Sequence, residues 1–270
     1  MTTFKDHFSG HAADYAKFRP NYPPKLFDHL ASISPERELA WDCATGSGQA
    51  AVGLAERFAK VIATDASAQQ IESAQRHPGI SYRVAPSEAS GIEPGSVDLI
   101  LVAQALHWFD MDRFFTEAKR VSKESGILAV STYTHVSVNP EIDEILSKFY
   151  RETTGPYWPP ERDLVETNFE SIRFPFPELP SHQFAMRQQW NLAQLTGYLR
   201  TWSATKKFIA VRGFDPVDSL MQELGSVWRD REHARQVTWP LKRRSNGVVR
   251  TTSPVAANFT INTSIAISHY

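Results

Sequence analysis

Leu39-Ala40-Trp41-Asp42-Cys43-Ala44-Thr45-Gly46-Ser47-Gly48 is the stretch that decides the fold of this 270-residue chain. The apolar run over residues 39–43 predicts a buried strand, and the two glycines after it predict a tight turn into a helix. Glycine has no Cβ, so it lets the backbone turn sharply and leaves room for a ligand against the main chain. Open α/β sheets bind their ligands at turns of this kind, beyond the carboxyl ends of the strands.

Strands and helices alternate downstream of this turn. The pattern predicts helices over residues 49–59, 68–76 and 111–122, and strands over 61–64, 80–84, 97–103 and 127–131. The run over 97–103 is almost entirely apolar, as is typical of a strand that is buried on both faces. Because alternating elements form right-handed crossovers, we expect an α/β fold with a doubly wound, mostly parallel sheet.

The chain divides into four segments by composition and pattern. We predict an N-terminal helical lid over residues 1–38, a ligand-binding core over 39–135, and a cap with the last strands over 136–242. Residues 243–270 are rich in Ser, Thr and Asn without a clear period, and we predict a disordered tail there.

The overall composition excludes several classes of protein. Lys and Arg total 29 against 30 Asp and Glu, so the net charge of −1 argues against a nucleic-acid binder, which needs a basic surface. The single cysteine excludes a disulfide framework and a multi-cysteine metal site, and we predict no metal. We find no apolar run long enough to span a membrane and no secretory signal, so we expect a cytoplasmic protein.

Two acidic residues lie beside the glycine turn. Asp42 precedes the glycines, and Asp65 ends the next apolar run, where a carboxylate can accept two hydrogen bonds from a ribose diol. The spacing Gly46-x-Gly48-x-x-Ala51 also fits a dinucleotide-binding fingerprint. The glycines alone therefore leave open a nicotinamide cofactor, another nucleoside cofactor, or a turn without a ligand.

With these residues the chain resembles the class I S-adenosylmethionine-dependent methyltransferases over about residues 4–241. The matching pieces are Asp42-x-Ala44-Thr45-Gly46-Ser47-Gly48, Asp65, Ser96-Val97-Asp98-Leu99-Ile100 and Gln104-Ala105-Leu106-His107-Trp108-Phe109. The opening pattern Phe8…Tyr15…Arg19-Pro20-x-Tyr22-Pro23 looks like the small-molecule branch that contains trans-aconitate methyltransferase-like proteins. The resemblance implies a Rossmann-like methyltransferase fold with a seven-stranded sheet.

The resemblance also implies contacts to the cofactor from the glycine turn and the strand that follows. Asp42 would bind the amino group in the methionine part of S-adenosylmethionine, and the backbone of Ala44 and Gly46 would hold the same part. Gly48 lies in the same loop. Asp65 would bind the ribose hydroxyls.

Other positions would complete the cofactor site by the same resemblance. Ala66 would lie beside the adenine, and Ser87 and Glu88 would occupy the position at the edge of the adenine. Gln104 and His107 would close the pocket near the sulfonium. Tyr15 and Arg19 would fold over the cofactor, with Arg19 facing its carboxylate. Two departures from the family pattern are Ala44, where many relatives have glycine, and Pro86, where many have aspartate.

The predicted reaction is an in-line transfer of a methyl group to a small-molecule acceptor, which includes carboxylates. Such a transfer needs alignment and exclusion of water more than a strong base. His107 is the candidate proton acceptor. The alternatives are an NAD-dependent oxidoreductase and a non-catalytic interaction protein that keeps the fold. The segment Gln104-Ala105-Leu106-His107 lacks the prolines typical of base-amine methylation, so we expect no nucleic-acid partner, and a monomer or weak homodimer.

Overall fold

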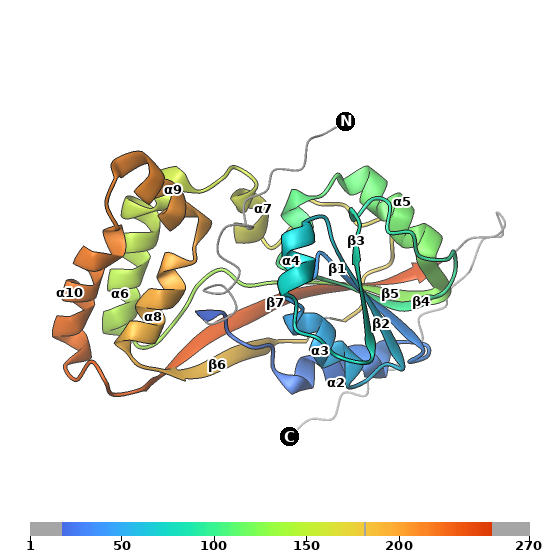
Figure 1. Ribbon diagram of the computed structural model, residues 1–270, viewed down its shortest axis with the longest axis horizontal. Coiled ribbons are helices and arrows are strands. Elements are labelled where there is room, and N and C mark those ends of the chain that lie inside the picture. Colours follow the sequence, from blue (N-terminus) through green and yellow to red (C-terminus); the bar gives the residue numbers. More distant parts are fainter. Residues whose placement is uncertain (1–17, 181, 250–270) are drawn as a thin grey trace, which may run out of the picture.

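The computed structural model describes residues 18–180 and 182–249. It contains a seven-stranded sheet in the order β3-β2-β1-β4-β5-β7-β6 (Figure 1). The strands are β1 (Leu39–Cys43), β2 (Lys60–Asp65), β3 (Ile80–Val84), β4 (Val97–Ala103), β5 (Ser122–Thr132), β6 (Phe184–Trp190) and β7 (Arg235–Val249). The first five strands are parallel, and β7 is antiparallel to both β5 and β6. The expected fold class, a doubly wound and mostly parallel seven-stranded sheet, is confirmed.

Helices cover both faces of this sheet. The helices are α2 (Pro24–Ile33), α3 (Gln49–Ala55), α4 (Ala68–Ser73), α5 (Met111–Val121), α6 (Pro140–Lys148), α7 (Arg162–Glu166), α8 (Leu192–Arg200), α9 (Ser203–Arg212) and α10 (Pro216–Trp228). Figure 1 shows α6, α8, α9 and α10 grouped at one end of the sheet, beyond β6 and the start of β7. We refer to these four helices as the cap helices.

Alternate residues of the central strands enter two separate hydrophobic cores. Leu99 and Leu101 of β4 share one core with residues of α2, α3, α6, α8 and α10, whereas Ile100 and Val102 share the other with residues of α5 and α7. Both sets are fully buried. This explains why the strand reads as a continuous apolar run, because a parallel strand between two helical layers has no face toward water.

The predicted disordered tail over residues 243–270 is wrong for its first seven residues. Residues 243–249 belong to β7, and residues 242–249 pair with Thr132 to Ser125 of β5. Ser245 and Asn246 are buried there despite their polarity. This part of β7 pairs with β5 on one side, and on the other side the Leu179 N–H donates to the Ser245 carbonyl and the Gly247 N–H donates to the Pro177 carbonyl. Backbone hydrogen bonds on both sides therefore stabilise it without an apolar pattern. The predicted boundary at residue 242 therefore cuts a strand, and residues 250–270 lie outside the described residues.

The predicted helices begin where expected and end early, α5 by a single residue and the other two by three or four. The helix predicted over 49–59 ends at Ala55, and that predicted over 68–76 ends at Ser73. In the described part of the chain, no helix is long and apolar enough to cross a membrane.

Candidate active site

The glycine turn between β1 and α3 is built from backbone in the left-handed region. Ala44, Gly46 and Gly48 have φ angles of 57°, 55° and 84°. A Cβ at Gly46 would meet only the Gln70 side chain, at 3.9 Å, whereas one at Gly48 would lie 2.4 Å from the Tyr82 hydroxyl. Gly46 thus leaves open space beside the backbone, and Gly48 is required for packing against β3. The methyl group of Ala44 is accommodated in spite of its strained backbone.

Asp65 is tied directly to this turn. Its Oδ2 accepts a hydrogen bond from the backbone N–H of Gly46 at 2.9 Å, and its Oδ1 accepts one from that of Ser67 at 2.9 Å. The acid therefore also has a structural role, which sequence reasoning did not assign to it. A carboxylate offers about four lone-pair sites, so these two bonds leave acceptor capacity on both oxygens.

Asp42 is a carboxyl group buried at the end of β1, with 1 % of its surface exposed. Burial raises its pKa to about 7, and the nearby charge of Asp65 contributes to the rise. Hydrogen bonds from the Thr45 hydroxyl and the Ala51 backbone act in the opposite direction and lower the pKa. The Thr45 hydroxyl donates to Oδ2 at 2.5 Å. Within residues 18–180 and 182–249 no Lys, Arg or His forms an ion pair with Asp42. A buried carboxylate in these surroundings fits an ammonium group, which would restore its charge.

The loop after β3 lies against the end of β2. The Ala85 N–H donates to the Asp65 carbonyl at 3.0 Å, and the Ala89 N–H donates to the Pro86 carbonyl at 3.2 Å. Ser87, which is buried, and Glu88 are thus the central residues of a four-residue turn beside the ribose-binding candidate. Ala66, directly after Asp65, is half-buried. The structure brings these sequence-predicted residues together at the carboxyl edge of the sheet.

Gln104 and Arg19 lie farther along the same edge and are both anchored to the end of β5. Gln104 has a φ of 61°, and its amide donates to the Tyr133 carbonyl at 2.9 Å and accepts from the Thr132 hydroxyl at 2.9 Å. Arg19 donates to the Tyr133 hydroxyl at 3.0 Å, and its guanidinium lies 5.4 Å from the centre of the Tyr198 ring. Tyr15, predicted to lie beside Arg19, is outside the described residues.

A pocket opens between this edge and the cap helices. The aromatic side chains that line it are those of Trp108, Tyr133, Trp158, Tyr198 and Trp202. The cationic or neutral polar side chains that line it include those of Arg19, Gln104, His107 and Arg162. Tyr133 and Trp158 were not among the predicted site residues, because their sequence neighbourhoods carry no motif. The Trp158 indole N–H and the His107 Nδ1 are buried there and have no hydrogen-bond partner among the residues that the structure describes.

Comparison with known proteins identifies the family. The model of the family described as "Methyltransferase domain" matches residues 41–130, which contain the glycine turn and both acids. A Dictyostelium discoideum protein assigned as a methyltransferase is 34% identical over 232 residues, covering 84% of this chain and 88% of the relative. This chain belongs to the methyltransferases.

Further relatives agree with this assignment. The solved structure of an Anaeromyxobacter dehalogenans protein, assigned as a type II methyltransferase, has a TM-score of 0.82 and 41% identity and covers 86% of this chain and 99% of that chain. A Saccharomyces cerevisiae protein assigned as an S-adenosylmethionine-dependent methyltransferase is 28% identical over 152 residues, covering 52% of this chain and 51% of the relative. The expected enzyme class and its cofactor, S-adenosylmethionine, are confirmed.

His107 is poorly suited to act as a general base in this methyltransferase. Burial and the nearby Arg162 guanidinium lower its pKa to about 3, and its ring packs against Trp108 with centroids 4.6 Å apart. The side chain is therefore neutral at physiological pH and binds protons weakly. Its Nδ1 remains available for a hydrogen bond to a ligand in the pocket.

Proposed function

We propose that this methyltransferase transfers the methyl group of S-adenosylmethionine to a small-molecule acceptor that carries a carboxylate. The observation that carries this proposal is the aromatic pocket, where the unpartnered indole N–H of Trp158 lies with Arg162. An indole N–H is only a donor and a guanidinium is only a donor, so the pocket favours a ligand rich in acceptor oxygens.

The glycine turn and its two acids would hold the methyl donor. Asp42 would pair with its ammonium group, Asp65 would accept the ribose hydroxyls, and open space at Gly46 would admit the ligand against the backbone. Ala44 and Gly48 would give the turn its shape. The bound donor would supply a methyl group attached to a sulfonium sulfur, and that sulfur would leave as a neutral thioether when the methyl group is transferred.

The remaining predicted residues would bind the two ends of the donor. Ala66, Ser87 and Glu88 would contact the adenine, since the turn that carries the last two lies beside the end of β2. Arg19 would face the donor carboxylate from across the pocket. Gln104 would close the site near the sulfonium. Its side-chain amide is held in place by hydrogen bonds with the Thr132 hydroxyl and the Tyr133 carbonyl.

Arg162 is the cation best placed to orient the acceptor. Its Nε donates to the Glu166 carboxylate at 3.0 Å and to the Tyr150 hydroxyl at 3.1 Å, and its guanidinium lies 4.7 Å from the centre of a Trp158 ring. The group is therefore held in one orientation at the pocket wall. Holding two reactants in line can lower a barrier by roughly 7–11 kcal/mol in favourable cases.

A carboxylate acceptor is consistent with the protonation state of the pocket. A carboxylic acid is already ionised at neutral pH, so its oxygen attacks without loss of a proton to the enzyme. The neutral His107 would then serve as a hydrogen-bonding wall beside Trp108. The aromatic side chains would exclude water from the reacting groups.

The test is a screen of small carboxylic acids, thiols and phenols for release of S-adenosylhomocysteine by the purified protein. We expect release with carboxylic acids and a methyl ester as product. For an acid that turns over, Arg162→Gln should raise the acceptor KM about tenfold, as expected for one charged hydrogen bond, with the cofactor Kd unchanged. Arg151→Gln, at an exposed arginine outside the pocket lining, is the control. Turnover with thiols or phenols alone would refute the acceptor class.

A further inference from the structure

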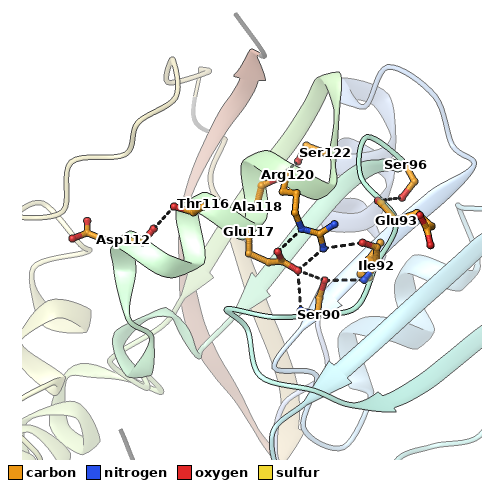
Figure 2. Close-up of polar contacts among 10 residues, drawn as sticks. All are labelled: Ser90, Ile92, Glu93, Ser96, Asp112, Thr116, Glu117, Ala118, Arg120 and Ser122. Carbon is orange, nitrogen blue, oxygen red and sulfur yellow. Dashed lines mark hydrogen bonds and ion pairs between the residues drawn. The ribbon is translucent and has the colours of Figure 1, made fainter. Parts of the chain in front are cut away.

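The loop between β3 and β4 is fastened to helix α5 along its length. Near its start, the Glu88 carboxylate accepts a hydrogen bond from the Asp110 N–H at the beginning of α5, at 3.2 Å. Near its end, the N–H groups of Gly95 and Ser96 donate to the carbonyls of Arg120 and Val121. Between these points the side chains of Glu117 and Arg120 reach from α5 into the loop (Figure 2).

Glu117 makes the central contact of this set. Its Oε1 accepts the Ser90 N–H at 2.8 Å and the Ser90 hydroxyl at 2.6 Å. Arg120 donates to both oxygens of Glu117, at 2.7 Å each, and to the Ile92 carbonyl at 2.8 Å (Figure 2). The Glu117 residue is only 6 % exposed. Burial alone would raise its pKa, but the hydrogen bonds from Arg120 and Ser90 hold the pKa below its ordinary value, so the carboxylate is charged.

These contacts lie directly beside the turn that carries the adenine-binding candidates. Ser87 and Glu88 occupy the centre of the turn from Pro86 to Ala89. The backbone of the preceding residue, Ala85, is bonded to Asp65 at the end of β2, and the following residue, Ser90, is bonded to Glu117. The turn is therefore fixed on both sides, by the ribose-binding strand on one and by a buried carboxylate of α5 on the other.

We propose that Glu117 is a positioning residue that sets where this turn presents Ser87 to the adenine of the cofactor. The inference rests on the proposed assignment of Ser87 and Glu88 to the adenine edge. Glu117 does not touch the cofactor; it acts through the double hydrogen bond to Ser90. The Pro86 side chain has no hydrogen-bonding group, so recognition of the adenine amino group depends on where Ser87 and the turn backbone lie.

The experiment compares the binding of S-adenosylhomocysteine with that of S-inosylhomocysteine, in which an oxo group replaces the 6-amino group of the base. Glu117→Gln keeps the shape but removes the charge and turns a donor toward Arg120 or Ser90. Ser90→Ala, the milder variant, removes one of the two bonds to Glu117. Arg57→Gln, which removes the ion pair between Arg57 and Asp28 far from the turn, is the matched control. Titration calorimetry gives both dissociation constants for each protein.

We expect the wild type to bind the adenosyl compound more tightly than the inosyl compound. Glu117→Gln should bind the adenosyl compound about tenfold more weakly than the wild type does, with little change in its affinity for the inosyl compound. Ser90→Ala should show a smaller loss in the same direction, which decides the question if Glu117→Gln does not fold. Arg57→Gln should keep the wild-type preference. The proposal would be overturned if Glu117→Gln and Ser90→Ala lowered the melting temperature but left the preference for the adenosyl compound unchanged. A wild type that binds both compounds equally would overturn it too. A wild type that binds neither would instead refute the cofactor site itself.

Discussion

Asp42→Asn tests the electrostatics of the site most directly. Burial raises the pKa of Asp42 from its ordinary 3.8 to about 7 in the folded protein. A folded state that holds a proton more tightly than the unfolded state is stabilised at low pH, and the stabilisation declines as the pH rises through 7. A shift of this size corresponds to about 4 kcal/mol, and about 2 kcal/mol of it is lost between pH 5 and 7.

Asparagine mimics the protonated carboxyl group at every pH, so the variant should not show this decline. It accepts hydrogen bonds through one oxygen only, whereas Asp42 accepts from both Thr45 and Ala51, so about 1 kcal/mol is lost at all pH values. At pH 8 we expect ligand-free Asp42→Asn to be more stable than the wild type by about 2–3 kcal/mol. Under the proposed assignment, we expect the gain in stability to come with loss of function, because a neutral amide would not pair with the charged ammonium group of the methyl donor.

The assay is urea unfolding of both proteins without ligand, at pH 5, 6, 7 and 8. Differences between the two curves isolate Asp42, since all other titrating groups are shared. Calorimetry with S-adenosylhomocysteine gives the second readout: wild-type affinity should rise with pH up to about 7, and the variant should bind weakly without this dependence. Parallel pH profiles of stability for the two proteins would refute the reasoning.

Four further predictions concern the turn, the pocket and the last strand. Asp65→Ala should weaken cofactor binding by about 1.5–3 kcal/mol in calorimetry, and an unchanged Kd would contradict its assignment. Gly48→Ala should destabilise the protein by about 1–3 kcal/mol in urea, because its Cβ would meet the Tyr82 hydroxyl; full stability would show that β3 can move aside. His107→Gln should have the same pH profile of kcat near pH 6.5 as the wild type, whereas loss of a titration step there would show that His107 acts as the general base. Truncation before Arg243 should lower the melting temperature sharply or prevent folding, and an unchanged melting temperature would mean that β7 is dispensable.

The core of the fold and the candidate site at the carboxyl edge of the sheet were predictable because their signals are local. The apolar run over residues 97–103, the two glycines and the acid at the end of β2 can each be recognised from neighbouring residues in the chain. Parallel strands then bring their carboxyl ends to one edge, so Asp42, Asp65 and Ser87 had to gather there. The protonation states were less accessible: the weak basicity of His107 arises from burial and from Arg162, which is remote in sequence.

By itself, the sequence determined the alternation of strands and helices, the strained turn and the carboxylates beside it, since these depend on backbone geometry and short-range hydrophobic pattern. Only the tertiary structure decided that the polar residues Ser245 and Asn246 form an interior strand, and that Tyr133 and Trp158 meet in one pocket. The physical reason is that a strand between two partners is stabilised by hydrogen bonds to residues far away in the chain, and a pocket wall by packing between distant elements. Neither interaction leaves a period in the sequence.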